Sequence, residues 1–210
     1  MERQQCLLVG SSLARELNQI SPNQLVCKNH FYFQGHLTEA KITGLKNWLK
    51  QKRTYYEKIV LFHGNTMFPS RKHFTGRGEY HYCLKKVNIE IVTEMYQALM
   101  NALSLFCKAV VMIEPPPRCI NRQGLLPSCF SYDEECKSRF RRIERKLFCY
   151  AQLGLKTIRK EELCNDCAYF DFSNEKWPEH DIYQLTAPDG IHLGDLPKKR
   201  LRIHIQMPLV

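Results

Sequence analysis

Short apolar runs alternate along the chain with longer segments in which apolar residues recur every three or four positions. Five of the runs have the length and composition of buried β-strands. They cover residues 6–9, 25–27, 58–62, 109–113 and 155–158. The longer segments have the spacing of helices that place one face on a sheet. These predicted helices cover residues 13–20, 38–49, 87–106, 133–154 and 196–205.

Strands that alternate with helices at this spacing predict parallel βαβ units joined by right-handed crossovers. The chain has 210 residues, of which 44% are apolar, so it can bury a sizeable core. We therefore expect one α/β domain over residues 1–210, although two smaller domains would fit the same length. The aromatic run at residues 31–33 either extends the second strand or lines a pocket.

Turn residues follow four of the predicted strands. Ser12 follows the first strand, Gly35 the second and Asn65 the third, and a proline-rich turn at residues 115–117 follows the fourth. In open parallel sheets, ligands bind at the carboxyl ends of the strands. The sequence therefore predicts that these residues belong to one shared site.

Near the end of the chain, a carboxylate lies three positions before an imidazole, as Asp189 and His192. A histidine that acts as a general base needs a group that fixes its tautomer and stabilises its charged form, and a carboxylate can do both. Ser12, at a strand-to-helix turn, is the candidate that would give its proton to this histidine. Taken alone, each of these blocks is also typical of a surface turn or a helix cap.

Taken together, the blocks resemble those of the SGNH, or GDSL, hydrolase family. Residues 10–13 read Gly-Ser-Ser-Leu against the family's Gly-Asp-Ser-Leu, and Asp189 and His192 match its Asp-x-x-His. Residues 63–66 read His-Gly-Asn-Thr against its Gly-x-Asn-Asp, with Asn65 at the asparagine. The blocks follow one another in the family's order. The resemblance implies a three-layer α/β/α fold with a mostly parallel, flavodoxin-like central sheet.

The resemblance also implies a serine esterase that works through an acyl-enzyme. Ser12 would be the nucleophile, His192 the general base and Asp189 the group that orients the imidazole. The oxyanion would be held by the Ser12 amide, the Gly35 amide and the side chain of Asn65. This chemistry needs no metal and no organic cofactor, and its substrate would be a small ester or an acylated compound.

Some features depart from the family pattern and motivate an alternative. Ser11 replaces the aspartate of the first block, and His63 and Thr66 replace two residues of the third. The formal net charge is +10, with basic clusters at residues 137–146 and 198–202. The alternative is a catalytically weak or inactive SGNH-like domain that binds nucleic acid or a protein partner through this basic surface. Esterase domains in animal non-LTR retrotransposon proteins are similar in their basic, cysteine-rich character.

The ten cysteines bear on compartment and on metal binding. No apolar run is long enough for a membrane span or a signal peptide, so we expect an intracellular protein whose cysteines are reduced. Cys164 and Cys167 have the spacing of half a zinc site, and Cys119, Cys129 or Cys136 could add ligands. Since a second Cys-x-x-Cys or a spaced histidine pair is missing, we expect no zinc. A zinc-supported interaction module is the hypothesis that rests on this pair. The sequence does not indicate an oligomeric state.

Residues 67–86 form a long polar and aromatic connection after the third predicted strand. A connection of this length beside a site is typical of a lid or a substrate-selecting wall. His63, His73 and His81 lie in or next to it. Because their spacing does not fit a metal site, we expect them to be solvent-exposed loop residues.

Overall fold

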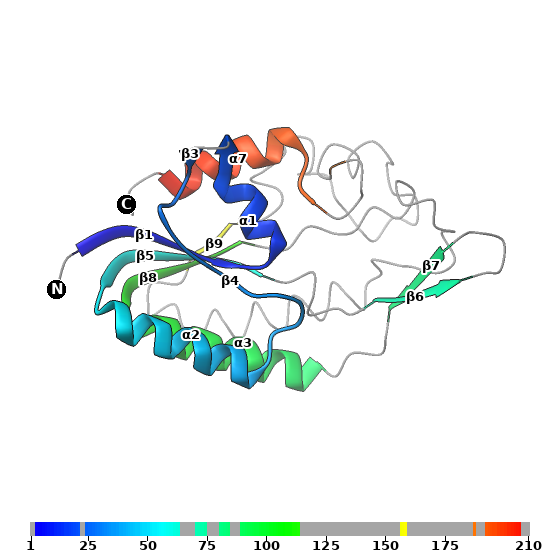
Figure 1. Ribbon diagram of the computed structural model, residues 1–210, viewed down its shortest axis with the longest axis horizontal. Coiled ribbons are helices and arrows are strands. Elements are labelled where there is room, and N and C mark those ends of the chain that lie inside the picture. Colours follow the sequence, from blue (N-terminus) through cyan, green and yellow to red (C-terminus); the bar gives the residue numbers. More distant parts are fainter. Residues whose placement is uncertain are drawn as a thin grey trace.

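The computed structural model of the chain describes residues 3–21, 24–63, 70–74, 80–84, 89–113, 156–158, 187 and 192–206. Within these ranges the main sheet has five strands, and every neighbouring pair is parallel (Figure 1). In their spatial order the strands are β4 (Asn29–Tyr32), β1 (Arg3–Gly10), β5 (Tyr55–Phe62), β8 (Cys107–Ile113) and β9 (Lys156–Ile158). Ranked along the chain this order is 2-1-3-4-5, the flavodoxin order. The predicted flavodoxin-like α/β sheet is therefore confirmed.

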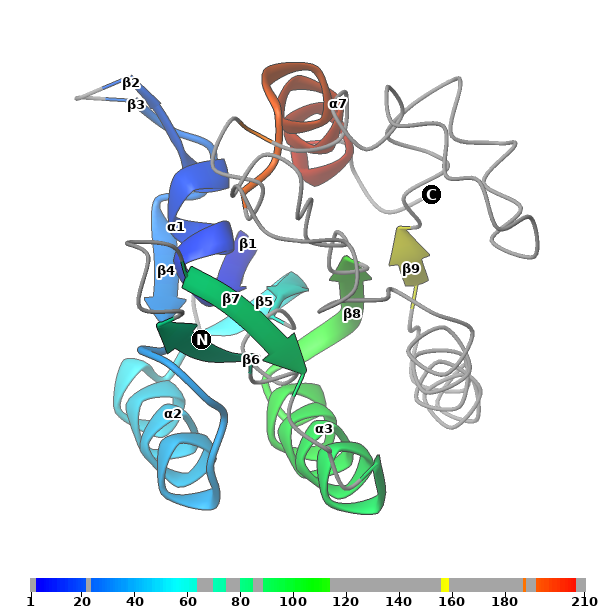
Figure 2. The same ribbon diagram turned by 90° about the vertical axis from the view of Figure 1, so that its right-hand side faces the viewer.

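Helices cover both faces of the sheet. Figure 2 shows α1 (Ser12–Asn18) and α7 (Asp195–Gln206) over one face and α2 (Glu39–Lys52) and α3 (Ile89–Ser104) over the other. The predicted three-layer arrangement is therefore confirmed. None of the helices in the described ranges is both long and apolar enough to cross a membrane.

The strands bury side chains on both faces. In β1, Leu7 and Val9 belong to the core beneath α2 and α3, while Leu8 belongs to the core beneath α1 and α7. Parallel strands covered on both faces have nearly continuous apolar sequences. This is why the strands at the centre of the sheet were recognisable from sequence.

Helix α2 begins where its sequence predicts. Thr38 is the N-cap, and its hydroxyl accepts a hydrogen bond from the backbone N–H of Lys41 at 3.4 Å. The buried face consists of Ile42, Leu45 and Leu49. These three positions recur at helical spacing, so the predicted amphipathic helix is confirmed.

Helix α7 matches its predicted range to within a residue at each end, and Pro197 lies in its first turn. For α3 the sequence predicts a buried face at Ile91, Met95, Leu99 and Leu103, and this prediction is only partly correct. Leu99 and Leu103 are fully buried, but Ile91 is 54% exposed, because the buried face near the start of the helix is formed by Val92 and Tyr96.

The second strand of the main sheet lies at a different place from the prediction. Of the run 25–27, only Leu25 is in a strand, the short β3 (Gln24–Leu25), which pairs antiparallel with β2 (Gln19–Ser21) outside the main sheet. The strand beside β1 is β4, in the aromatic run that was expected either to extend the second strand or to line a pocket. Phe31 and Tyr32 pack on opposite faces of the sheet, as successive residues of a strand do. The sequence analysis instead placed the strand in the more apolar run at 25–27.

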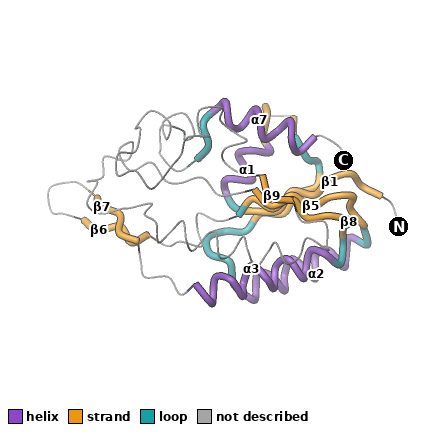
Figure 3. The backbone as a smooth tube through the Cα atoms, turned by 180° about the vertical axis from the view of Figure 1, so that it is seen from behind, coloured by secondary structure: helices purple, strands orange, loops and turns teal. Residues whose placement is uncertain are grey.

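The long connection after β5 contains a β-hairpin rather than loop alone. Strands β6 (Ser70–Phe74) and β7 (Tyr80–Leu84) pair antiparallel, with His73 opposite His81. Figure 3 shows the hairpin beyond the end of the main sheet, far from the N-terminus. In β7 the sequence Tyr80-His81-Tyr82 alternates aromatic residues with a polar one, a pattern that favours strand structure. The predicted helix at 133–154 lies outside the described residues.

Candidate active site

The turn after β1 is fixed by close packing at Gly10. A β-carbon on this residue would lie 2.1 Å from the backbone oxygen of Phe62 and 2.6 Å from the β-carbon of Ala14. The backbone N–H of Ser11 donates to the same Phe62 oxygen at 3.3 Å. Ser11 is buried as the N-cap of α1, and Ser12 is the first residue of the helix. The chain therefore turns sharply from strand to helix, and Ser12 lies at the carboxyl end of β1.

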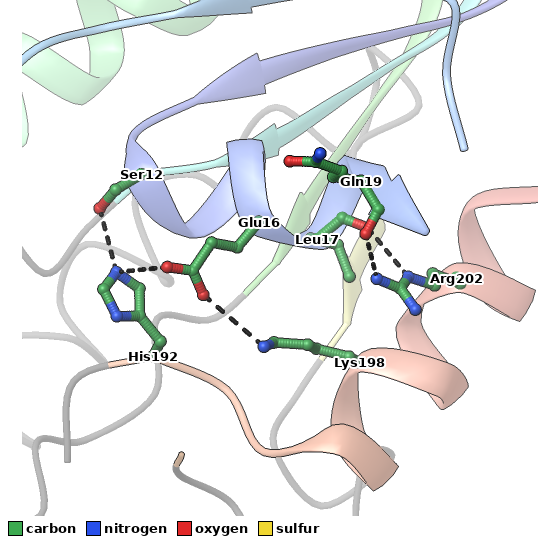
Figure 4. Close-up of polar contacts among 7 residues, drawn as sticks. All are labelled: Ser12, Glu16, Leu17, Gln19, His192, Lys198 and Arg202. Carbon is green, nitrogen blue, oxygen red and sulfur yellow. Dashed lines mark hydrogen bonds and ion pairs between the residues drawn. The ribbon is translucent and has the colours of Figure 1, made fainter. Parts of the chain in front are cut away.

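His192 lies just before α7, across from this turn. Its backbone oxygen accepts a hydrogen bond from the N–H of Ala187 at 2.7 Å. Its ring nitrogen Nε2 is 3.4 Å from Oγ of Ser12 (Figure 4). The structure thus brings together the serine and the histidine that the sequence singled out, although 180 positions separate them.

Glu16 is a third polar group at this point, and the sequence reasoning missed it. Its Oε1 is 3.2 Å from Nε2 of His192, and its Oε2 is 3.6 Å from Nζ of Lys198 (Figure 4). Glu16 follows Ser12 by four positions, so both side chains lie on one face of α1. That spacing was the signal by which the sequence could have revealed it.

The contact of Glu16 differs from that of a triad carboxylate. A triad carboxylate receives the Nδ1–H of the histidine, which leaves Nε2 to accept the serine proton. Glu16 instead approaches Nε2, the same nitrogen that faces Ser12. Since Nε2 carries at most one proton, it cannot donate to Glu16 and accept from Ser12 at the same time. Asp189, the predicted orienting carboxylate, lies outside the described residues.

The loop after β4 runs beside the Ser12 turn. The backbone N–H of Phe33 donates to the oxygen of Gly10 at 2.6 Å. Two residues later, Gly35 has a positive φ of 65°, which favours glycine. The ammonium group of Lys41 donates to the backbone oxygens of Gln34 and His36 and so holds both sides of this glycine. Gly35 therefore lies in a fixed, exposed turn close to the carboxyl ends of β1 and β4.

His63, at the end of β5, is buried and is not the solvent-exposed loop residue that was expected. Its ring makes an edge-to-face contact with Phe33, with the ring centroids 5.4 Å apart, and its backbone oxygen accepts a hydrogen bond from the hydroxyl of Tyr96. Burial, with smaller effects from the charges of Lys41 and His36, lowers the pKa of His63 to about 4. The imidazole is therefore neutral at pH 7. Asn65, the predicted oxyanion donor two positions later, lies outside the described residues.

The end of the sheet where these residues lie is a topological switch point. The chain leaves β1 towards one face through α1 and leaves β4 towards the other through α2. Ligands of doubly wound sheets bind in the crevice at the carboxyl ends of such strands. Ser12, Gly35 and His63 follow β1, β4 and β5, so all three lie at this end.

Part of the C-terminal basic cluster supports α1. The guanidinium of Arg202 donates from Nε to the oxygen of Leu17 at 3.0 Å and from a terminal nitrogen to the oxygen of Gln19 at 2.7 Å (Figure 4). These oxygens lie at the end of the helix, where carbonyls lack helical partners. Together with the pairing of Lys198 and Glu16, these bonds fix α7 against the helix that carries Ser12.

Potential metal ligands are scattered in the part of the chain that the structure describes. Among the described residues, His, Cys, Asp and Glu side chains do not gather in groups of three or more that could hold a metal ion. Cys164 and Cys167, the candidate zinc ligands, lie outside those residues, as does the basic cluster at 137–146. The expectation of a metal-free site stays a prediction.

Comparison with known proteins gives similarity in structure alone. No protein-family model and no curated protein matches the sequence. The fold is similar to a GDSL-like lipase from Bacteroides thetaiotaomicron, with a TM-score of 0.58 and 9% identity over 95% of this chain and 84% of that one. It is also similar to a protein from Bacteroides fragilis named as an acylhydrolase, with a TM-score of 0.55 and 12% identity over 97% and 84% of the two chains. The chain therefore has the α/β fold that these GDSL-like proteins share.

Proposed function

We propose that this chain is a serine hydrolase that cleaves carboxylic esters through an acyl-enzyme. The observation that carries the proposal is the approach of His192 Nε2 to Ser12 Oγ at 3.4 Å, at the carboxyl end of β1. A nucleophilic hydroxyl needs a base within hydrogen-bond reach, and such contacts are often long before substrate binds. The GDSL-like fold supports the same chemistry.

In the proposed mechanism, Nε2 of His192 takes the proton of Ser12 as its oxygen attacks the ester carbonyl. The imidazolium then gives this proton to the departing alcohol, and water cleaves the acyl-enzyme in the same two steps. The oxyanion is stabilised by the backbone amides of Ser12 and Gly35 and by the side chain of Asn65. Asp189 orients the imidazole through Nδ1. The substrate is a small ester or an acylated compound.

Glu16 affects the availability of the base in this mechanism. While Nε2 holds a proton, its donation to Glu16 keeps the imidazole from accepting the proton of Ser12. Lys198 pairs with the other carboxylate oxygen of Glu16 and so helps to hold this carboxylate beside His192. The contact between Glu16 and Nε2 therefore affects how often the Ser12–His192 pair is ready to react.

Labelling by a serine-directed fluorophosphonate tests the proposal. We expect the wild-type protein to be labelled, Ser12→Ala to be unlabelled, and His192→Ala to react more slowly by roughly a thousandfold or more. Ser11→Ala is the matched control. Among the described residues no partner reaches the buried hydroxyl of Ser11, so its removal should leave labelling unchanged. An unlabelled wild-type protein, or equal labelling of Ser12→Ala, refutes the proposal.

Binding of nucleic acid or a protein partner by the basic surface stays a prediction. Of the cluster at residues 198–202, Lys198 and Arg202 make contacts within the chain. A protein that fails to label but is retained on nucleic acid, with a retention that falls steeply with salt, would favour this alternative.

A further inference from the structure

Two cysteines lie side by side in the core that α1 covers. Cys6 lies in β1 and Cys27 lies in the segment between β3 and β4. A hydrogen bond joins their sulfur atoms, which are 2.8 Å apart. A disulfide has a sulfur–sulfur distance of about 2.05 Å, so the thiols need to approach by less than about 1 Å to be joined. Both are free thiols in this structure.

The position of Cys27 is fixed by a buried amide. Asn18, the last residue of α1, accepts from the backbone N–H of Cys27 at 2.7 Å and donates to its backbone oxygen at 3.0 Å. The same side-chain nitrogen is 2.8 Å from the hydroxyl of Tyr32. Asn18 is fully buried, so these bonds are shielded from water. Cys27 is thus held against β1 by contacts that do not depend on its thiol.

A cation lies next to the pair. Lys58 of β5 is the register partner of Cys6 across the parallel ladder, and it is buried. The hydrogen bond with Cys6 and then the charge of Lys58 lower the pKa of Cys27, although burial opposes them. The same hydrogen bond, with burial, raises the pKa of Cys6. The pair therefore favours one thiolate and one thiol, the combination that thiol–disulfide exchange requires.

We propose that Cys6 and Cys27 are a redox modification site that forms a reversible intramolecular disulfide with a low-molecular-weight disulfide as the oxidant. Cys27 is buried but Cys6 is partly exposed, so the oxidant reaches the pair through Cys6. In the resting pair the shared proton lies on Cys6, so it first passes to Cys27, and the Cys6 thiolate then attacks one sulfur of the oxidant and displaces the other as a thiolate. Cys27 gives its proton to this leaving thiolate. The resulting Cys27 thiolate attacks the sulfur of Cys6 in the mixed disulfide and displaces the second thiolate, which takes a proton from water. Two protein thiols lose two electrons and two protons, and the oxidant becomes two thiols.

The disulfide would join the two segments of the chain that flank α1, the helix that begins at Ser12. Cys6 lies in the strand that leads into α1, and Cys27 is bound to Asn18 at the other end of that helix. Oxidation would therefore close a covalent loop around α1. We expect the oxidised protein to unfold at a higher temperature than the reduced protein.

Peptide mapping of the whole protein tests this proposal without any assay of hydrolysis. The protein is equilibrated in glutathione buffers from reducing to oxidising, quenched with acid, alkylated and digested with trypsin. Cleavage after Arg3, Arg15 and Lys28 places Cys6 in peptide 4–15 and Cys27 in peptide 16–28, with no other cysteine in either. We expect a disulfide-linked pair of these peptides in oxidising buffer that disappears on return to reducing buffer.

Matched controls exclude general oxidation. Cys107, buried in β8 with its thiol hydrogen-bonded to the oxygen of Leu103, lies in peptide 87–108 and should remain alkylated throughout. In Cys27→Ser, peptide 4–15 should instead carry glutathione, because no second thiol resolves the mixed disulfide. The proposal is overturned if both wild-type peptides stay fully alkylated in the oxidising buffer. It is also overturned if Cys6 keeps glutathione or pairs with another cysteine while the protein remains folded.

Discussion

Protonation of His63 should make the stability of this protein depend on pH. The perturbation is the removal of its titratable ring in His63→Phe, which keeps an aromatic side chain against Phe33. An unfolded chain exposes the histidine, with a pKa of about 6.5. In the folded protein, burial and the nearby charges of Lys41 and His36 lower this pKa to about 4. Between these values the unfolded chain binds a proton that the folded protein does not.

The magnitude follows from proton linkage. The contribution of neutral His63 to the free energy of unfolding is fully present above the unfolded pKa of about 6.5. It is lost as the pH falls from there towards the folded pKa of about 4. At completion the loss is about 3 kcal/mol, and between pH 7 and pH 5 it is about 2 kcal/mol. Because His63 is fully buried, solvent does not screen the effect substantially.

The assay is chemical denaturation at a series of pH values, followed by circular dichroism. Other groups titrate in this range, so the quantity of interest is the difference between wild type and variant. Wild type should lose about 2 kcal/mol more than His63→Phe between pH 7 and pH 5. His63→Asn, which is polar but does not titrate, should follow His63→Phe. If the pH dependence of all three proteins is the same, a buried neutral His63 is ruled out.

Three further changes test the packing and the site. Gly10→Ala should lower the free energy of unfolding by about 1–3 kcal/mol or more, because the new β-carbon meets the backbone of β5. Gly44→Ala should raise it by about 0.5–1 kcal/mol, because Gly44 lies in α2 with open space around it. Equal effects of the two changes in denaturant unfolding would contradict this account. Asn18→Ala should lower the free energy of unfolding by about 2–3 kcal/mol, because the buried backbone N–H and C=O of Cys27 lose their hydrogen-bond partners. A decrease of less than half of that would show that these two groups form other hydrogen bonds in the variant. Glu16→Ala should raise kcat/KM for an activated ester about two- to fivefold, because it frees Nε2 of His192 from a partly exposed ion pair, and such pairs are weak. A fall in kcat/KM would show instead that Glu16 supports the reaction.

The centre of the sheet was predictable from sequence because β1, β5 and β8 are buried on both faces. The apolar runs of β1, β5 and β8 could be identified as strands from their own sequences, without knowing which strands lie beside them. Strand β4 was harder, since its residues 29–32 are only half-buried and their role depends on pairing with β1. The nearby run 25–27 was the more apolar choice, yet an amide of Asn18 rather than a strand satisfies the backbone of Cys27.

The candidate site was predictable only where the local sequence determines geometry. Gly10 and the turn into Ser12 follow from close packing, which a short motif can encode. The contact of Glu16 with His192 depends on how α7 docks against α1, and nothing in either segment alone specifies that docking. The burial of His63 likewise depends on Phe33 from another part of the chain.

The separation of Ser12 from His192 has a consequence for biosynthesis. The helix with the serine leaves the ribosome 180 residues before the histidine does. Until then the apolar surface of α1, including Leu13 and Leu17, lacks the cover that Leu201 of α7 later supplies. During this interval the nascent chain carries Ser12 without its proposed base and an apolar surface without its full cover. A ribosome that stalls before α7 emerges would leave a fragment that exposes this surface and lacks the proposed Ser12–His192 pair.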